Sequence, residues 1–270
     1  MVPRAITIAG SDSGGGAGIQ ADLKTFTSLR VFGMSAITAI TAQNTLGVLG
    51  VQRVAPDVVR LQIQACVEDI GVDASKTGML CDAEIVAVVA EAMKEFRLPK
   101  LVVDPVMVSK SGHRLLAEDA VRVLREKLLP LALVVTPNLA ETSVLTGMDV
   151  NNLERMERAA RLIHSMGPQF VVVKGGHLGR TGQGKAADLV YDGRDFTVLE
   201  KDWVDTKNTH GTGCTFSAAI TGYLALGYQT LDAIRKGKEF VTWALRHSFS
   251  LGQGHGPTNH FYPWEGCPQA

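Results

Sequence analysis

A cysteine stands at the start of an apolar run in the segment 208–220, NTHGTGCTFSAAI. Gly211 and Gly213 permit the backbone angles of a tight turn, and a helix beginning near Thr212 would offer unpaired N–H groups and a partial positive charge. Such a turn can bind an anion such as phosphate. The same helix start would favour the thiolate of Cys214, so we expect a thiol that accepts a proton or a hydrogen bond near neutral pH. A plain threonine-capped turn and a merely buried cysteine are the alternatives.

Three charged side chains follow buried, apolar segments. Asp104 ends the run KLVVD before a proline, and Glu141 follows the next such run. Two carboxylates at neighbouring strand ends can hold a hydrated magnesium ion, which needs only one or two protein carboxylates besides phosphate oxygens. Helix capping by Glu141 is the alternative. Lys174 ends VVVK before two glycines, where its ammonium can reach phosphate oxygens or simply lie in solvent.

Two other glycine-rich segments imitate nucleotide-binding motifs. Residues 16–21, GAGIQA, match the loose dinucleotide pattern GxGxxA, but no acidic residue lies between Asp22 and Asp57 to hold a ribose hydroxyl. Residues 179–186, GRTGQGKA, nearly match a P-loop, but Ala186 lacks the hydroxyl that binds magnesium and a strand-like segment follows. We therefore expect neither a nicotinamide or flavin site nor a Walker motif, and interpret 179–186 as a flap near a nucleotide.

Short β-branched runs alternate with helical patterns along the chain. Runs that are apolar throughout are typical of strands covered on both faces, as in a parallel sheet, and they fall at 5–9, 35–42, 100–104, 131–136 and 170–174. Helical patterns fall near 18–30, 56–69, 82–97, 115–128, 152–166, 212–226 and 230–249. Residues 185–205 instead predict a β-hairpin that turns at Asp192-Gly193. This order predicts a doubly wound α/β fold.

Polar residues and glycines follow each predicted strand at the same end. The strands are followed by GSD, QN, KTGM, PV, PN and GG, counting a further strand near residue 75. Ligands of open parallel sheets bind at the carboxyl ends of the strands. We therefore expect these residues to surround one crevice.

The composition is that of an ordinary globular protein. The chain has 270 residues, of which 46% are hydrophobic and 20% charged, and we expect one domain spanning 1–270. The 27 basic residues balance the 27 acidic ones, so no net field attracts nucleic acid or a membrane surface. The first apolar run is too short for a signal peptide, and no run reaches the roughly 20 residues of a membrane span. We expect a soluble, cytoplasmic protein.

The cysteines and the two histidines of the tail do not form a metal-binding pattern. The four cysteines are far apart and without a CxxC pair, so we expect free thiols, with Cys66 and Cys81 as small buried side chains. His255 and His260 lie in a Gly- and Pro-rich tail without nearby ligands. We interpret both histidines as surface residues.

Seven segments, in order between residues 9 and 219, together resemble one family: AGSDSGGGAGIQADLKTF, TAQNT, KTGML, DPVMVSKSGHRLL, TPNLAE, VVVKGGH and HGTGCTFSAA. The family is that of the hydroxymethylpyrimidine/phosphomethylpyrimidine kinases of thiamine biosynthesis, within the ribokinase-like superfamily. The resemblance implies a three-layer α/β/α sandwich with a central, mostly parallel sheet and a late β-hairpin. It also implies ATP-dependent phosphorylation of 4-amino-5-hydroxymethyl-2-methylpyrimidine and then of its monophosphate, with Mg²⁺ as cofactor, by a homodimer.

The resemblance implies catalytic roles for the residues discussed above. Most ribokinase-like kinases carry a catalytic aspartate in a GxGD turn, and Cys214 would take its place. The amides from Gly211 to Cys214, including that of Gly213, would surround the moving phosphoryl group. Lys174 would steady phosphate, while Asp104 and Glu141 would hold the water shell of magnesium.

Binding roles also follow from the resemblance. Gln43 would hydrogen-bond the aminopyrimidine, because a side-chain amide presents both the donor and the acceptor that an amino group and a ring nitrogen require. Asp22 would bind the substituents of the ring. The other pocket residues would be Gly10, Ala17 and Met79. The nucleotide would contact Asp104, Lys174 and Thr212, with Lys236 on a terminal helix near the adenine.

Two other functions are compatible with these residues. A pyridoxal or pyridoxine kinase of the same superfamily phosphorylates a ring alcohol of similar size, but Gln43 followed by Asn44 favours the pyrimidine. A nonenzymatic vitamin-binding module would keep the crevice without turnover. It is disfavoured because every expected catalytic position is occupied.

Overall fold

The computed structural model describes residues 1–107, 118–176 and 184–264. A nine-stranded sheet has the order β3-β2-β1-β4-β5-β6-β7-β8-β9. Its strands are β1 (Arg4–Asp12), β2 (Phe32–Gln43), β3 (Val48–Arg53), β4 (Ala74–Thr77), β5 (Leu101–Val103), β6 (Val134–Val135), β7 (Phe170–Lys174), β8 (Lys185–Tyr191) and β9 (Phe196–Asp202). The strands from β2 to β7 in this order run parallel, whereas β3, β8 and β9 pair antiparallel. The predicted mostly parallel sheet and late hairpin are confirmed.

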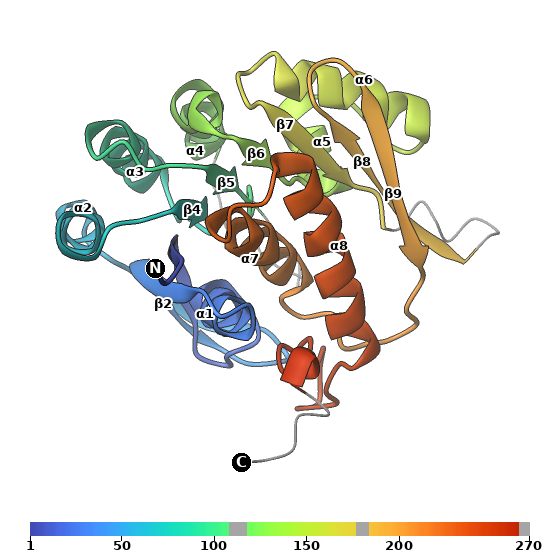
Figure 1. Ribbon diagram of the computed structural model, residues 1–270, viewed down its shortest axis with the longest axis horizontal. Coiled ribbons are helices and arrows are strands. Elements are labelled where there is room, and N and C mark those ends of the chain that lie inside the picture. Colours follow the sequence, from blue (N-terminus) through green and yellow to red (C-terminus); the bar gives the residue numbers. More distant parts are fainter. Residues whose placement is uncertain (108–117, 177–183, 265–270) are drawn as a thin grey trace.

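Helices cover both faces of the sheet (Figure 1). One face carries α1 (Gly18–Ser28), α7 (Thr212–Ala225) and α8 (Thr230–Arg246), and the other carries α2 (Pro56–Ala65), α3 (Ala83–Glu95), α4 (Glu118–Val123), α5 (Leu139–Thr146) and α6 (Leu153–His164). Successive strand residues point to opposite faces. Val103 and Val135 accordingly join the core under α2 to α6, whereas Val102 and Val134 join the core under α7 and α8. This is the predicted three-layer sandwich.

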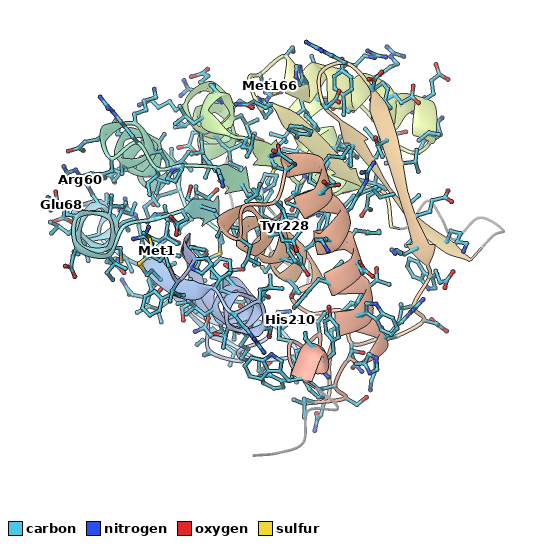
Figure 2. The ribbon with its side chains drawn as sticks, in the orientation of Figure 1. Met1, Arg60, Glu68, Met166, His210 and Tyr228 are labelled. Atoms are coloured by element: carbon cyan, nitrogen blue, oxygen red, sulfur yellow. The ribbon has the colours of Figure 1, made fainter. Side chains whose placement is uncertain are left out.

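Local sequence explains where the outer helices begin and which side they bury. The side chain of Asp82 accepts a hydrogen bond from Ile85 N and so caps the first turn of α3. Ile85, Val89 and Met93 follow at four-residue intervals and are all buried against the sheet. Charged residues take the outer positions, as Arg60 of α2 and Glu68 just beyond it show at the edge of the molecule (Figure 2).

Helix α7 is buried along nearly its whole length because it lies between the sheet, α1 and α8. Small residues make this possible. A Cβ on Gly222 would lie 2.7 Å from Leu29 Cδ1, and one on Gly237 of α8 would lie 2.7 Å from Ile220 Cγ1. The helix is therefore held on several sides, which fixes the position of its first turn.

The structure also differs from the sequence-based expectations. Helix α5 and the edge strand β3 were not predicted. The helices expected at 56–69 and 115–128 end in π-helical turns, Cys66–Ile70 and Leu124–Leu128, and the tail includes a 3-10 turn, Tyr262–Trp264. Among the described residues, no helix combines the length and apolarity that a membrane crossing requires.

Candidate functional site

A cavity of about 190 Å³ lies where the carboxyl ends of the parallel strands meet the first turn of α7. Five of the six segments singled out after the predicted strands contribute to its wall, and the sixth strand contributes its last residue, Lys174, in place of the two glycines that follow it, so the predicted single crevice is confirmed. The wall is formed by Ala9, Gly10, Ser11, Asp12, Ala17, Gly18, Thr41, Gln43, Val48, Lys76, Gly78, Met79, Asp104, Val106, Asn138, Glu141, Lys174, His210, Gly211, Thr212, Gly213 and Cys214.

The first turn of α7 forms one side of the cavity. Gly211 is the N-cap and has a φ of 78°, in the left-handed region that favours glycine. A Cβ on Gly211 would lie 1.8 Å from Gly16 O, so this turn packs directly on the loop that follows β1. The N–H groups of Gly213 and Cys214 belong to the turn that has no intrahelical acceptors, and that turn contains no acidic residue. The geometry offers a site for an anion.

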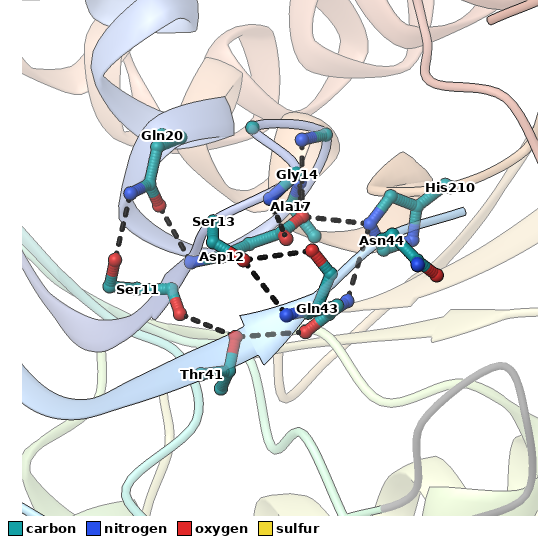
Figure 3. A network of polar contacts seen from close by, with 12 residues as sticks. Ser11, Asp12, Ser13, Gly14, Ala17, Gln20, Thr41, Gln43, Asn44 and His210 are labelled. Carbon is teal, nitrogen blue, oxygen red and sulfur yellow. Dashed lines mark hydrogen bonds and ion pairs between the residues drawn. The ribbon is translucent and has the colours of Figure 1, made fainter. Parts of the chain in front are cut away.

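A polar network joins the loop after β1 to the same turn (Figure 3). Asp12, the last residue of β1, accepts hydrogen bonds from the N–H groups of Gly14 (2.8 Å), Gly16 (3.1 Å) and Ala17 (2.8 Å). Its Oδ2 also lies 2.8 Å from Nε2 of His210, just before the α7 turn. Burial opposes the charge on Asp12, but His210 and the backbone N–H groups outweigh it, so the pKa of Asp12 lies below its ordinary value.

Gln43 lies on the cavity wall at the edge of this network. Its Oε1 accepts a hydrogen bond from Thr41 Oγ1 (3.2 Å), and its Nε2 lies 3.4 Å from Nε2 of His210 (Figure 3). Its backbone exchanges two hydrogen bonds with the hydroxyl of Ser13, each 2.8 Å long. The side-chain amide is therefore held at the cavity, as predicted, together with Gly10, Ala17 and Met79.

Lys174, Asp104 and Glu141 converge beside the first turn of α7, where a Cβ on Gly213 would lie 3.4 Å from Lys174 Nζ. Lys174 Nζ lies 3.1 Å from Asp104 Oδ1 and 3.9 Å from Glu141 Oε2. Asp104 also accepts hydrogen bonds from Thr136 and Ser217, both 3.2 Å long. Burial opposes the charge on Asp104, but Lys174 and Lys76 outweigh it and hold the pKa of Asp104 below its ordinary value.

Glu141 has a second role as a helix cap. Its Oε2 accepts a hydrogen bond from Asn138 N (2.7 Å), while Glu141 N donates to Asn138 Oδ1 (2.9 Å), which together form a capping box at the start of α5. The sequence left capping and metal binding open as alternatives, and the geometry is compatible with both. Burial raises the pKa of Glu141 to about 7, although Lys174 lowers it.

These carboxylates fit a hydrated magnesium ion. Asp104 and Glu141 both line the cavity and both approach the ammonium of Lys174. Within the described residues, no group of three His, Cys, Asp or Glu side chains could hold a metal. An ion held by one or two carboxylates, water and phosphate oxygens needs no such group.

Cys214 is half-buried on the cavity wall, but its expected reactivity is wrong. Burial raises the pKa of the Cys214 thiol to about 12, and Asp22 and Asp104 raise it further. Lys76 and the N–H of Gly18 oppose this rise without offsetting it. The charge at the helix start does not produce a thiolate near neutral pH, because desolvation is the larger effect.

Asp22 lies beneath the cavity and not on its wall, contrary to the prediction for substrate binding. It is fully buried in α1, and its Oδ2 accepts hydrogen bonds from Thr7 Oγ1 (2.6 Å) and Lys76 Nζ (2.8 Å). Asp22 therefore partners Lys76, which does line the cavity.

Lys236 does not line the cavity, and its contact with the nucleotide near the adenine stays a prediction. Its Nζ lies 5.7 Å and 5.0 Å from the ring centroids of Tyr223 and Tyr228. Tyr223 is near the C-terminal end of α7, about 16 Å along the axis from Thr212 at the rise of an α-helix.

The histidines of the tail differ from each other. His255 is exposed, as predicted, and its Nδ1 lies 2.9 Å from Lys207 O. His260 is buried, which corrects the prediction of a surface residue, and its Nε2 lies 3.0 Å from Oγ1 of Thr215, next to Cys214. Burial lowers the pKa of His260 to about 4.

The cysteine predictions are largely confirmed. Cys66, Cys81 and Cys214 are free, and Cys66 and Cys81 are partly buried against the larger core. Cys267 lies outside the described residues. So do most of the glycine-rich flap expected at 179–186 and most of the segment DPVMVSKSGHRLL. The strand that follows the flap is confirmed as β8, which supports the rejection of a P-loop.

Sequence reasoning missed four residues that the structure places at or under the site. Asp12 and His210 stand inside quoted motifs, but only the fold shows that they meet. Lys76 opens KTGML, where a lysine within a buried strand was itself a signal. Asp188 of β8 accepts hydrogen bonds from Gly175 N (3.1 Å) and from Lys238 Nζ (2.7 Å), and so fixes the backbone beyond Lys174.

The layered fold and a cavity that joins a glycine-bounded helix start to a lysine and two carboxylates define a ribokinase-like small-molecule kinase. The chain belongs to the phosphomethylpyrimidine kinase family, whose model matches residues 12–259.

Individual relatives agree with this assignment. A hydroxymethylpyrimidine/phosphomethylpyrimidine kinase of Synechococcus elongatus is 50% identical over 262 residues, which cover 97% of this chain and 98% of the relative. A pyridoxine kinase of Bacillus subtilis is 48% identical over 260 residues, or 95% of each chain. The crystal structure of an ADP complex of Bacillus subtilis pyridoxal kinase matches with a TM-score of 0.90 and 47% identity, covering 97% of this chain and 98% of that one.

Proposed function

We propose that this protein phosphorylates 4-amino-5-hydroxymethyl-2-methylpyrimidine with ATP and then phosphorylates the resulting monophosphate to the diphosphate, as a step in thiamine biosynthesis. The observation that carries the proposal is that one cavity is lined by the side-chain amide of Gln43, by the first turn of α7 and by Lys174. The 50% identity to a kinase with this name, over 97% of the chain, supports the choice of acceptor.

The reaction at this site is a phosphoryl transfer. An acceptor oxygen forms a bond to the γ-phosphorus of ATP, the bond from that phosphorus to the β,γ-bridging oxygen breaks, and ADP leaves. The acceptor alcohol releases one proton, which passes to a phosphate oxygen of the nucleotide or to water. Because the transition state is loose, positioning and charge stabilisation contribute most of the catalysis.

The donor side of the cavity is assigned to Lys174 and the first turn of α7. The N–H groups of Gly213 and Cys214 point toward the space in which the transferring phosphoryl group would lie, with Thr212 and Gly211 completing the turn. Lys174 supplies a compact positive charge beside them. Asp104 and Glu141 would hold Mg²⁺ through its water shell, and the ion would neutralise charge on the triphosphate when bound.

The acceptor side is assigned to the wall formed by Gln43, Met79, Gly10 and Ala17. The amide of Gln43 can hydrogen-bond an amino group and a ring nitrogen, and Met79 supplies a polarisable surface for the ring. A Cβ on Gly10 would lie 2.4 Å from Met79 Cε, so glycine leaves room for this methionine.

Cys214 is assigned to the reacting hydroxyl, but as a thiol. With a pKa of about 12, it is protonated at neutral pH. Its sulfur can accept a weak hydrogen bond from the acceptor hydroxyl and so orient the attacking oxygen. In a loose transition state, proton removal from the hydroxyl need not be complete when the O–P bond forms, so orientation by a thiol is sufficient.

The direct test is turnover with defined acceptors. The purified protein is incubated with ATP, Mg²⁺ and the aminopyrimidine alcohol, and ADP and both phosphorylated products are measured over time. We expect the monophosphate to appear first and the diphosphate to follow. Absence of ADP with this alcohol, while the protein binds it, would favour a nonenzymatic binding module.

A vitamin B6 kinase is the second candidate, because a pyridoxine kinase is 48% identical and a pyridoxal kinase matches with a TM-score of 0.90. Comparing kcat/KM for pyridoxine and the pyrimidine alcohol decides between the two. We expect the pyrimidine to be preferred, and Gln43→Leu to reduce its kcat/KM more than that of pyridoxine. The reverse preference would identify a pyridoxine kinase.

The homodimer and the cytoplasmic location remain proposals. The edge strand β3 supports a dimer, because Leu49 and Val51 are exposed there and Ile40 is exposed on the neighbouring β2. Light scattering of the purified protein tests the dimer. A mass equal to one chain at micromolar concentration would contradict it.

A further inference from the structure

Lys76 is a lysine sealed inside the protein that nevertheless lines the cavity. Its side chain is 0% exposed, and it extends from β4 between α1 and the first turn of α7. A buried ammonium is costly unless it is paired. The ion pair of Lys76 and its unused hydrogen-bond donors therefore indicate its function.

The pairing of Lys76 leaves donors free. Its Nζ donates to Asp22 Oδ2 at 2.8 Å, and within the described residues this is its one hydrogen bond to the protein. An ammonium carries three N–H donors. Asp22 uses Oδ2 for both Lys76 and Thr7, while its Oδ1 has no partner in the described part of the chain. The pair thus holds the Lys76 charge in place without consuming its donors.

The surroundings of Lys76 place it on the acceptor side of the cavity. A Cβ on Gly78 would lie 3.3 Å from Lys76 Nζ, and Gly78 stands beside Met79 on the wall. Burial opposes the charge on Lys76, but the interactions with Asp22, Cys214 and Asp104 together outweigh it and hold the pKa of Lys76 above its ordinary value. Lys174, in contrast, lies between Asp104 and Glu141 on the donor side.

We propose that Lys76 is a catalytic cation of the acceptor half of the cavity, whose free N–H groups contact the attacking oxygen beside Cys214. This rests on the proposed function and adds a residue to it. In the first transfer, the attacking oxygen belongs to the alcohol and becomes negative as its proton leaves. In the second transfer, it belongs to the phosphate of the monophosphate, which brings its own negative charge into the cavity.

The two transfers then depend on Lys76 to different extents. A positioned cation stabilises charge that develops on an alcohol oxygen only in the transition state. It also stabilises a bound phosphate before any reaction, since charge-assisted hydrogen bonds are the stronger kind. Lys76 therefore supports kcat for the alcohol and supports both binding and kcat for the monophosphate.

The test compares Lys76→Met, Asp22→Asn and the double variant. Methionine keeps the length and loses the charge, but leaves Asp22 as a buried carboxylate without its cation. The double variant removes both charges and keeps an acceptor for Thr7, so it serves if Lys76→Met does not fold. Asp22→Asn breaks the same ion pair and keeps the ammonium, which makes it the matched control.

We expect both variants that lack Lys76 to lose roughly 10²-fold in kcat for the alcohol, and a further roughly tenfold in kcat/KM for the monophosphate. ADP affinity, measured by calorimetry, should stay within about twofold because the donor side is untouched. Asp22→Asn should lose less kcat and less kcat/KM than either variant that lacks Lys76. If the double variant has the same kcat for both acceptors as the unaltered protein, the proposal is overturned.

A second readout does not require turnover. The rate at which iodoacetamide alkylates Cys214 at pH 9, followed on the peptide by mass spectrometry, reports the charge near its sulfur. Lys76→Met should slow it, because a cation is removed, and Asp22→Asn should speed it, because an anion is removed. A merely structural disturbance would change the alkylation rates of both variants in the same direction, and that outcome would contradict the proposal.

Turnover by the unaltered protein distinguishes the role of Lys76 from the proposed function. If the unaltered protein phosphorylates neither acceptor, the proposed function is wrong whatever the variants do. If it phosphorylates both and the Lys76 variants match it, the function stands and the role of Lys76 is wrong.

Discussion

His210 Nε2 and Asp12 Oδ2 lie 2.8 Å apart, and this contact joins the loop that follows the first strand to the turn that begins α7. The residues are separated by most of the chain, yet the backbone at Gly16 also packs against the His210 ring, since a Cβ on Gly16 would lie 2.5 Å from His210 Cδ2. The carboxylate of Asp12 therefore fixes the position of the acceptor wall relative to the anion site.

Replacing that carboxylate should destabilise the protein. Asp12→Asn removes a charged acceptor of three backbone N–H groups and of His210, so we expect a loss of about 1–3 kcal/mol in the free energy of unfolding at pH 7. The pKa of Asp12 is lowered in the folded protein, so its stabilisation is present above the ordinary value of 3.8 and is lost as the pH falls through the folded value.

Urea unfolding from pH 3 to pH 7 measures this effect. The unaltered protein and Asp12→Asn should converge in stability at acid pH and diverge toward pH 7. Asp69→Asn, at an exposed position, is the control and should follow the unaltered protein. Equal stability of Asp12→Asn and the unaltered protein at pH 7 would refute the structural role.

Gly211 should tolerate no side chain. It combines a φ of 78° with a Cβ position 1.8 Å from Gly16 O, so Gly211→Ala must move one of the two loops. Gly227 has a φ of 91° but nothing within 4 Å, so Gly227→Ala isolates the cost of the backbone angle, about 1–2 kcal/mol. We expect Gly211→Ala to lower the thermal midpoint more than Gly227→Ala and to abolish ATP turnover. Comparable effects of the two variants would contradict the close packing.

Glu141 should make the protein less stable as the pH rises through its titration. Its pKa is about 7 in the folded protein and 4.5 ordinarily, so the folded state binds the proton more tightly. The stability that protonated Glu141 contributes is therefore complete below about pH 4.5. It is lost as the pH rises to about 7, by up to about 3 kcal/mol.

Glu141→Gln removes this titration while keeping an acceptor for the α5 cap. In metal-free buffer, the difference in unfolding free energy between Glu141→Gln and the unaltered protein should grow in favour of the variant between pH 5 and pH 7. A constant difference over that range would show that Glu141 is ionised throughout. With ATP present, Glu141→Gln should also need more Mg²⁺ to reach half-maximal turnover.

Cys214 should behave as a thiol over the whole working range. Because its pKa is about 12, its iodoacetamide alkylation should rise about tenfold for each pH unit from 7 to 10 without reaching a plateau. The peptide containing Cys66 provides an internal reference under the same conditions. A plateau below pH 9 would mean that the helix start does produce a thiolate, as the sequence alone suggested.

Much of the fold was predictable because its signals are local. The apolar runs of β1, β2, β5 and β7 and the helical periods beside them depend on residues within one element. Strand β3 was missed because it is an exposed edge strand, mixing polar residues and glycine with its apolar ones. Helix α5 was missed because it is short, although its capping box at Asn138 and Glu141 was readable.

The candidate site was predictable where a strand end dictates position, as for Gln43, Asp104 and Lys174. Asp22 and Lys236 do not line the cavity, for a common reason. Each lies on a helix, where the turn that a residue occupies decides whether it faces the cavity, and that depends on how the helix docks. The reactivity of Cys214 failed because burial, which the sequence does not display, outweighs the charge at the helix start.

The most direct test of the account is a crystal structure with the aminopyrimidine alcohol, Mg²⁺ and a nonhydrolysable ATP analogue. We expect the γ-phosphate at the N–H groups of Gly213 and Cys214, and the hydroxymethyl oxygen within hydrogen-bonding distance of Lys76 Nζ and Cys214 Sγ. A pyrimidine bound outside this cavity, or a γ-phosphate remote from the start of α7, would contradict the account.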